Sequence, residues 1–125
     1  MKKKVAPCSK AGNVEPLTKE VVFINGAARK AFEGLPNAEK IGFIHQLETL
    51  IANGCPPFLD IEHLPNDTIE LKMNGRPAFR CVYYNKLPDV VVVVHAFKKT
   101  TNGPDRKNLN TIALRIKAMD PNQFC

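Results

Sequence analysis

The 125-residue sequence lacks three features that would each indicate a class of protein. No apolar run approaches the length of a membrane span, which argues against a membrane-spanning helix. The basic start, Met1–Lys4, is followed by no apolar segment, so we expect no secretory signal and a cytoplasmic protein. No Cys-x-x-Cys pair is present, which argues against a metal site of paired cysteines. The cysteines are Cys8, Cys55, Cys81 and Cys125, and without export we expect all of them to be reduced thiols.

Acidic residues are scarce in one part of the chain. Residues 72–107 contain eight Lys and Arg residues but only two acids, Asp89 and Asp105. Residues 1–71 have a net charge of −1 and residues 108–125 a net charge of +1, so the middle segment carries the whole net charge of +6. A small domain with one basic surface is typical of a protein that binds a polyanion, and nucleic acid is the first candidate.

The periodicity of apolar residues predicts one α+β domain in the order β-α-α-β-β-β-α. We expect a flexible arm over residues 1–18, the folded domain over 19–120 and a short tail over 121–125. Residues 55–67 hold three prolines and indicate a connecting loop. The predicted strands are Glu20–Ile24, Ile69–Met73, Phe79–Asn85 and Val90–Phe97, and the predicted helices follow Ala27, Asn37 and Pro104.

The first two helices are joined by a short turn, so we expect an antiparallel hairpin that covers one face of the sheet and leaves the other face open. Five consecutive valines, Val90–Val94, predict a central strand buried on both faces. Alternation along the preceding strand places Arg80 and Tyr84 on one face and Tyr83 on the other. A bulge near His95 would change the face on which that histidine lies.

An ordered set of short motifs carries a resemblance to a known family. The motifs are Glu70-Leu-Lys72, Phe79-Arg80-x-x-Tyr83-Tyr84, His95-Ala-Phe97-Lys98-Lys99-Thr100 and Pro104, followed by an amphipathic helix with Ala113 and Arg115. In this order, and after a helical hairpin, the set resembles the RelE/HigB superfamily of toxins from type II toxin–antitoxin systems. The phage-derived HigB-like branch is the most similar part of that superfamily, and the resemblance covers roughly residues 20–119.

The resemblance implies a toxin that cleaves mRNA on the ribosome and thereby inhibits translation. It implies a RelE-like fold, in which a small, mostly antiparallel sheet carries two N-terminal helices and a C-terminal helix. It also implies a cognate antitoxin as partner, expected to be a small helix-turn-helix protein that forms a hetero-oligomer with the toxin. Neither a metal nor another cofactor is implied.

Metal-free RNA cleavage needs a group that accepts the 2′-hydroxyl proton, cations that stabilise the pentavalent phosphorane, and a group that protonates the departing 5′-oxygen. Arg80 is the first candidate for the phosphate, because its planar guanidinium donates two hydrogen bonds and stays charged. The alternative is an ion-paired arginine. His95 is the candidate for proton transfer, and its alternative is a hydrogen-bonded core histidine. Tyr84 is expected to stack on an extruded base or to donate a proton, with Tyr83 in the core.

Further cations surround these candidates. We expect Lys98 to contribute to catalysis and Lys99 to bind RNA, although one of this pair also fits a solvated strand end. Lys72 and Arg76 flank the first hairpin and are expected to bind neighbouring phosphates, while Arg76 also fits a turn residue without a further role. The remaining candidates for RNA binding are Arg106 and Lys107, which open the final helix.

Two other functions fit the same sequence. One is a ParE-like inhibitor that binds a topoisomerase without catalysis. His95, Tyr84 and the two lysines that follow Phe97 favour the enzyme, because a pure binder needs no proton-transfer groups. The other is an inactive prophage relative that binds RNA without cutting it.

Overall fold

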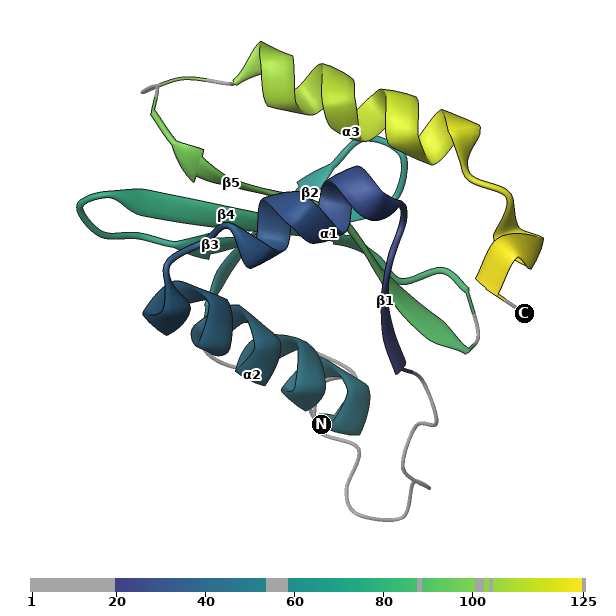
Figure 1. Ribbon diagram of the computed structural model, residues 1–125, viewed down its shortest axis with the longest axis horizontal. Helices are drawn as coiled ribbons and strands as arrows, with labels where there is room; N and C mark the ends of the chain where they lie inside the picture. Colours follow the sequence, from purple (N-terminus) through teal and green to yellow (C-terminus); the bar gives the residue numbers. More distant parts are fainter. Residues whose placement is uncertain (1–19, 54–58, 88, 101–102, 104, 125) are drawn as a thin grey trace, which may run out of the picture.

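The computed structural model describes residues 20–53, 59–87, 89–100, 103 and 105–124. Within them, five strands form one sheet in the order β1-β5-β4-β3-β2 (Figure 1). β1 runs parallel to β5 and the other neighbours are antiparallel, which confirms the predicted α+β class with a mostly antiparallel sheet. No helix in this part of the chain is long and apolar enough to span a membrane. The strands are β1 Glu20–Phe23, β2 Asp60–Leu64, β3 Thr68–Met73, β4 Ala78–Tyr84 and β5 Val90–Lys99; the helices are α1 Gly26–Glu33, α2 Asn37–Asn53 and α3 Arg106–Ala118, followed by the 3-10 helix η2 Pro121–Phe124.

Some sequence predictions fall outside the described residues. These are the flexible arm over residues 1–18, the thiol state of Cys8, Cys55 and Cys125, and the place of Pro104 at the start of the last helix. Cys81 is described, and it is a free, buried thiol whose pKa burial raises to about 12.

The predicted loop over residues 55–67 is wrong for residues 60–64, which form β2. β2 pairs antiparallel with β3, with Leu64 opposite Thr68. The chain reverses through Asn66 and Asp67, whose φ angles of 67° and 60° lie in the left-handed region that these two residue types tolerate best after glycine. The observed element order is therefore β-α-α-β-β-β-β-α.

The valine run is the centre of the sheet, as predicted. β5 lies between β1 and β4, and each residue of Val90–Val94 is at most 3% exposed. Alternate valines enter two separate cores, one on each face. The core beneath α2 contains Phe43, Leu47, Leu71, Tyr83 and Val93, and the core beneath α3 contains Val82, Val92, Val94 and Ile112.

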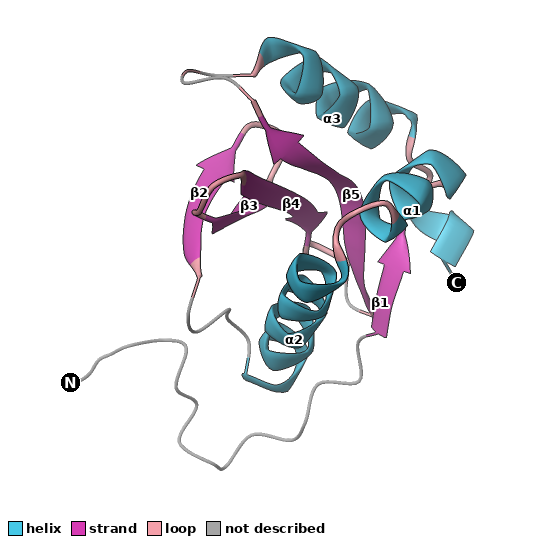
Figure 2. Cartoon of the chain, turned by 60° about the vertical axis from the view of Figure 1, so that its left-hand side comes forward, coloured by secondary structure: helices cyan, strands magenta, loops and turns pink. Residues whose placement is uncertain are grey.

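The prediction of helices on one face only is wrong in part. α2 and α3 lie on opposite sides of the sheet (Figure 2), and α1 contributes to both cores through Phe32 and Ala28. α3 packs on β5, so it covers only that part of its face. The rest of the same face, formed by β2, β3 and β4, carries no helix (Figure 2). This uncovered part of the sheet holds the candidate site.

Candidate active site

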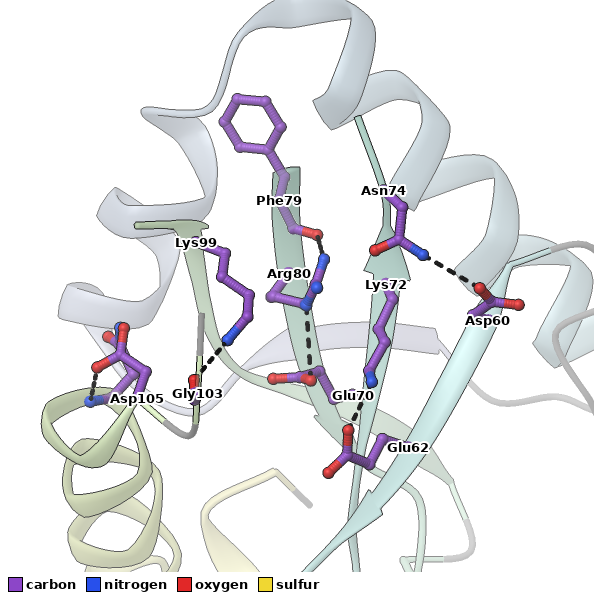
Figure 3. A network of polar contacts seen from close by, with 11 residues as sticks. Asp60, Glu62, Glu70, Lys72, Asn74, Phe79, Arg80, Lys99, Gly103 and Asp105 are labelled. Carbon is purple, nitrogen blue, oxygen red and sulfur yellow. Dashed lines mark hydrogen bonds and ion pairs between the residues drawn. The ribbon is translucent and has the colours of Figure 1, made fainter. Parts of the chain in front are cut away.

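Charged side chains form two rows across the uncovered face. Residues paired across neighbouring strands project to the same side of a sheet, so the pairing register places each row. One row contains Asp60, Lys72, Arg80 and Phe97, and the next contains Glu62, Glu70, Val82 and His95. Figure 3 shows the cations Lys72, Arg80 and Lys99 side by side, with the two glutamates beside them. The fold thus gathers acids and bases from four strands.

Arg80 is buried and paired with a carboxylate. Its residue is 6% exposed, its Nε lies 3.7 Å from Glu70 Oε1, and its Nη1 donates a hydrogen bond to the Phe79 carbonyl at 3.0 Å. Among the described residues, the Nε–H has no hydrogen-bond partner. Arg80 is therefore ion-paired, which was the alternative to phosphate binding, and its Nε–H is a buried donor that faces Glu70 without a hydrogen bond.

The carboxyl groups of Glu70 and Glu62 stand opposite each other but lie in different environments. Burial raises the pKa of Glu70, and the Arg80 charge only partly opposes this effect. A hydrogen bond from Lys72, 2.6 Å from Glu62 Oε1, lowers the pKa of Glu62. Two acids whose pKa values are moved apart by their surroundings suit different tasks. Glu70 is the one suited to exchange a proton.

Two hollows meet at Lys99. The first, a pocket of about 300 Å³ between the sheet and α3, holds both glutamates and an apolar wall. The second, about 440 Å³ at the β3–β4 hairpin end, contains three cations and no acid. The first is lined by Glu62, Leu64, Glu70, Lys72, Phe97, Lys99, Gly103, Asp105, Asn108 and Leu109, and the second by Gly75, Arg76, Pro77, Ala78, Arg80, Lys99 and Thr100. A chain of phosphates fits the cationic hollow, and a sugar with its base fits the pocket.

The structure separates the two lysines at the end of β5. The pairing of β4 with β5 skips Val94, which is a bulge, and this resets the alternation of the residues that follow. Lys99 pairs with Ala78 and shares the face of Arg80, and its Nζ donates to the Gly103 carbonyl at 3.0 Å. Lys98 pairs with Phe79, whose side chain lies in the core beneath α2, so Lys98 projects from the opposite face. Lys99, rather than Lys98, belongs to the charged cluster.

The same bulge brings His95 to the face of α3, where its side chain is engaged within the protein. His95 is 9% exposed, its Nε2 lies 2.6 Å from Asn108 Oδ1, and its Nδ1 lies 3.2 Å from Arg115 Nη1. Burial lowers the pKa of His95. Both ring nitrogens are thus occupied, and the geometry favours the hydrogen-bonded core histidine over the proton-transfer group.

Three other candidates, Tyr84, Arg106 and Lys107, lie apart from Arg80. Tyr84 is four residues further along β4, about 13 Å away at the rise of a strand, and it packs against the core beneath α3. Tyr83 is buried, as predicted, and burial raises its pKa to about 12. Arg106 and Lys107 are exposed in the first turn of α3 and line neither hollow.

Sequence reasoning assigned no role to Glu70 or to Asn108. The available signal for Glu70 was its place two residues before Lys72, which puts both side chains on one face of a strand. Its place beside Arg80 depends on the β3–β4 register. Among the described residues, no group of three or more His, Cys, Asp and Glu side chains is placed to hold a metal ion.

The described elements form a small α+β domain with a RelE-like fold. The chain belongs to the phage-derived protein Gp49-like family (DUF891), whose model matches residues 30–117, and the expected RelE-like fold is confirmed. A double arginine mutant of the Escherichia coli toxin RelE in its free state has a similar fold, with a TM-score of 0.55 and 17% identity over 78% of this chain and 96% of that chain. The toxin–antitoxin complex RelBE2 from Mycobacterium tuberculosis gives a TM-score of 0.47 and 15% identity over 70% of this chain and 98% of that chain. A search of curated proteins found no significant match.

Proposed function

We propose that this protein is the toxin of a toxin–antitoxin module and a metal-free, ribosome-dependent mRNA endonuclease that inhibits translation. The observation that carries the proposal is the buried Arg80–Glu70 pair within a cluster of cations on the uncovered sheet face. Such a cluster combines phosphate binding with a carboxyl group whose pKa is raised. The family and the fold support the same class of protein.

In the proposed mechanism, an RNA phosphate occupies the cationic hollow and its oxygens accept hydrogen bonds from the Arg80 guanidinium. This contact draws the guanidinium away from Glu70, whose carboxylate then accepts the proton of the adjacent 2′-hydroxyl. The 2′-oxygen attacks phosphorus, and Arg80, Lys72 and Lys99 stabilise the charge of the phosphorane. The bond to the 5′-oxygen breaks, and the Lys99 ammonium supplies its proton.

The other cations have a positioning role in this proposal. Arg76, at the open end of the cationic hollow, binds a neighbouring phosphate, and Arg106 with Lys107 contacts ribosomal RNA or the message. The partners are mRNA on the ribosome and a cognate antitoxin, expected to be a helix-turn-helix protein, in the cytoplasm. Tyr84, Lys98 and His95 are left outside the reacting groups.

Tightly induced expression tests the proposal. Wild-type protein is expected to arrest growth and to create new 5′ ends in transcripts, and Arg80→Ala to do neither. Arg29→Ala removes an exposed arginine on α1 and is the matched control, expected to behave as wild type. Arrest with intact transcripts would contradict the proposal, and a change in plasmid supercoiling would then identify the topoisomerase inhibitor. Soluble expression of the wild-type protein without growth arrest would contradict the proposal that the protein is a toxin.

A further inference from the structure

α3 is attached to β5 by a chain of polar contacts that no part of the proposed mechanism uses. Arg115 Nη1 donates to the Val94 carbonyl at 2.9 Å and lies 3.2 Å from His95 Nδ1. On the other side of the ring, His95 Nε2 lies 2.6 Å from Asn108 Oδ1. The amide nitrogen of Asn108 donates to Asp105 Oδ2 at 2.7 Å, and the Asn108 backbone N–H donates to Asp105 Oδ1 at 3.3 Å.

Only one protonation state of His95 satisfies all the hydrogen bonds in this series of contacts. A guanidinium can only donate, so Nδ1 must accept from Arg115 and carries no hydrogen. A carboxylate can only accept from Asn108, which fixes the amide with its oxygen toward His95, so Nε2 carries the hydrogen. The donors therefore run in one direction, from Arg115 through His95 and Asn108 to Asp105. A second ring proton would place an N–H on Nδ1 against the guanidinium of Arg115, and two positive charges together.

The far end of this chain is part of the candidate site. Asp105, Asn108 and Leu109 line the pocket that also contains Glu70 and Lys99. Asp105 is the N-cap of α3, so the chain fixes the first turn of the helix as a wall of the pocket. The hydrogen bonds of Asn108 exist in either protonation state of His95, whereas the contact of Nδ1 with Arg115 requires the neutral imidazole.

We propose that Asn108 and Arg115 are positioning residues that hold α3, whose first turn is a wall of the RNA pocket, against β5 through neutral His95, and that protonation of His95 breaks the Arg115 contact and loosens the helix. The effect on RNA rests on the proposed function, whereas the effect on α3 does not. The device makes the site sensitive to acid through a residue that does not touch the substrate.

The direction of the pH effect follows from the groups around the ring. Burial lowers the pKa of His95 and the charge of Arg115 adds to this, while the hydrogen bond with Asn108 and the charge of Asp105 oppose it. From the sheet, the His95 ring faces Phe97 and Val82. The Phe97 ring stacks on it with the ring centroids 5.2 Å apart, and Val82 is the residue paired with His95 on β4. The folded state therefore binds its proton less readily than the unfolded chain. The contribution of neutral His95 to the stability of the fold is complete above a pH of about 6.5, and it is lost as the pH falls toward the pKa of His95 in the folded protein.

The test combines NMR titration of His95 with hydrogen exchange of backbone amides between pH 7.5 and 5. In the wild type we expect the Nε2–H tautomer at pH 7.5, and a fall of about tenfold or more in the protection factors of α3 amides that follows the titration of His95. Amides of β3 and β4 are expected to keep their protection over the same range. Titration of His95 without a change in α3, or the other tautomer, would overturn the proposal.

Two variants separate positioning from a general loss of stability. Asn108→Asp supplies a carboxylate that stabilises the imidazolium, so the His95 titration is expected to move upward by about one pH unit. His95→Gln cannot take up a proton, so the protection of α3 is expected to be independent of pH. An unmoved titration in the first variant, or a pH-dependent α3 in the second, would contradict the proposal. If the protein cleaves RNA, the cleavage rate of the wild type is expected to fall at acid pH, and the share of this fall that is absent in His95→Gln is the share caused by α3. If the protein does not cleave RNA, the hydrogen-exchange results alone test the proposal.

Discussion

Glutamine in place of Glu70 is expected to lower the single-turnover rate of mRNA cleavage by about 10²- to 10⁴-fold, the usual contribution of a general base. The amide has the shape of the carboxyl group but cannot accept the 2′-hydroxyl proton. RNA binding is expected to be kept or strengthened, because the substitution removes the negative charge 3.7 Å from Arg80 Nε. Cleavage on programmed ribosomes and binding of a 2′-deoxy substrate measure the two effects separately.

Glu62→Gln is the matched control, since Glu62 lies directly opposite Glu70 and the change is the same. Its half-exposed ion pair with Lys72 contributes little, so we expect the cleavage rate to stay within about fivefold of wild type. Because the pKa of Glu70 is raised, wild-type activity is expected to fall as the pH drops through that pKa, and Glu70→Gln is expected to lack this limb. Equal losses in the two variants would show that Glu70 is not the base.

Methionine in place of Arg80 is expected to lower the free energy of unfolding by about 3–5 kcal/mol at pH 7, because it leaves Glu70 buried without its cation. The two side chains are only 7% and 12% exposed, so solvent screens the lost interaction weakly. The deficit is expected to shrink as the pH falls, since protonation of Glu70 removes the uncompensated charge. Urea unfolding at pH 7 and pH 5 measures both effects.

The double variant Arg80→Met with Glu70→Gln separates folding from chemistry. Without a buried charge, its free energy of unfolding is expected to return to within about 2 kcal/mol of wild type, while cleavage stays lost. A cost below about 1 kcal/mol for Arg80→Met, or no recovery in the double variant, would show that the two residues are not coupled.

The architecture was predictable where the pattern of apolar residues is strong. Val90–Val94 indicated the central strand because only a strand covered on both faces can bury five consecutive valines. β2 was missed because it is an edge strand with four exposed residues, so it shows no alternation of buried and exposed positions. Asn66 and Asp67 were the local signal for its hairpin, and the prolines around them favoured a loop instead.

The candidate site was predictable in its cations but not in its acid. Charge and motif order singled out Arg80, Lys72 and Lys99, which the sheet brings together. The burial of Glu70 depends on which residue of β4 stands opposite it, a property of the register. The place of His95 depended on a single extra residue at Val94, and five identical valines carry no polarity that could reveal the bulge.

The chemical ends of the cleaved message test the central claim most directly. Purified protein, ribosomes and a defined mRNA would be incubated, and the products would be analysed by mass spectrometry and by end-specific ligation. Attack by the 2′-hydroxyl predicts a 2′,3′-cyclic phosphate on one fragment and a 5′-hydroxyl on the other, with neither formed by Glu70→Gln at a comparable rate. Fragments with a 3′-hydroxyl and a 5′-phosphate, or an intact message, would contradict the account.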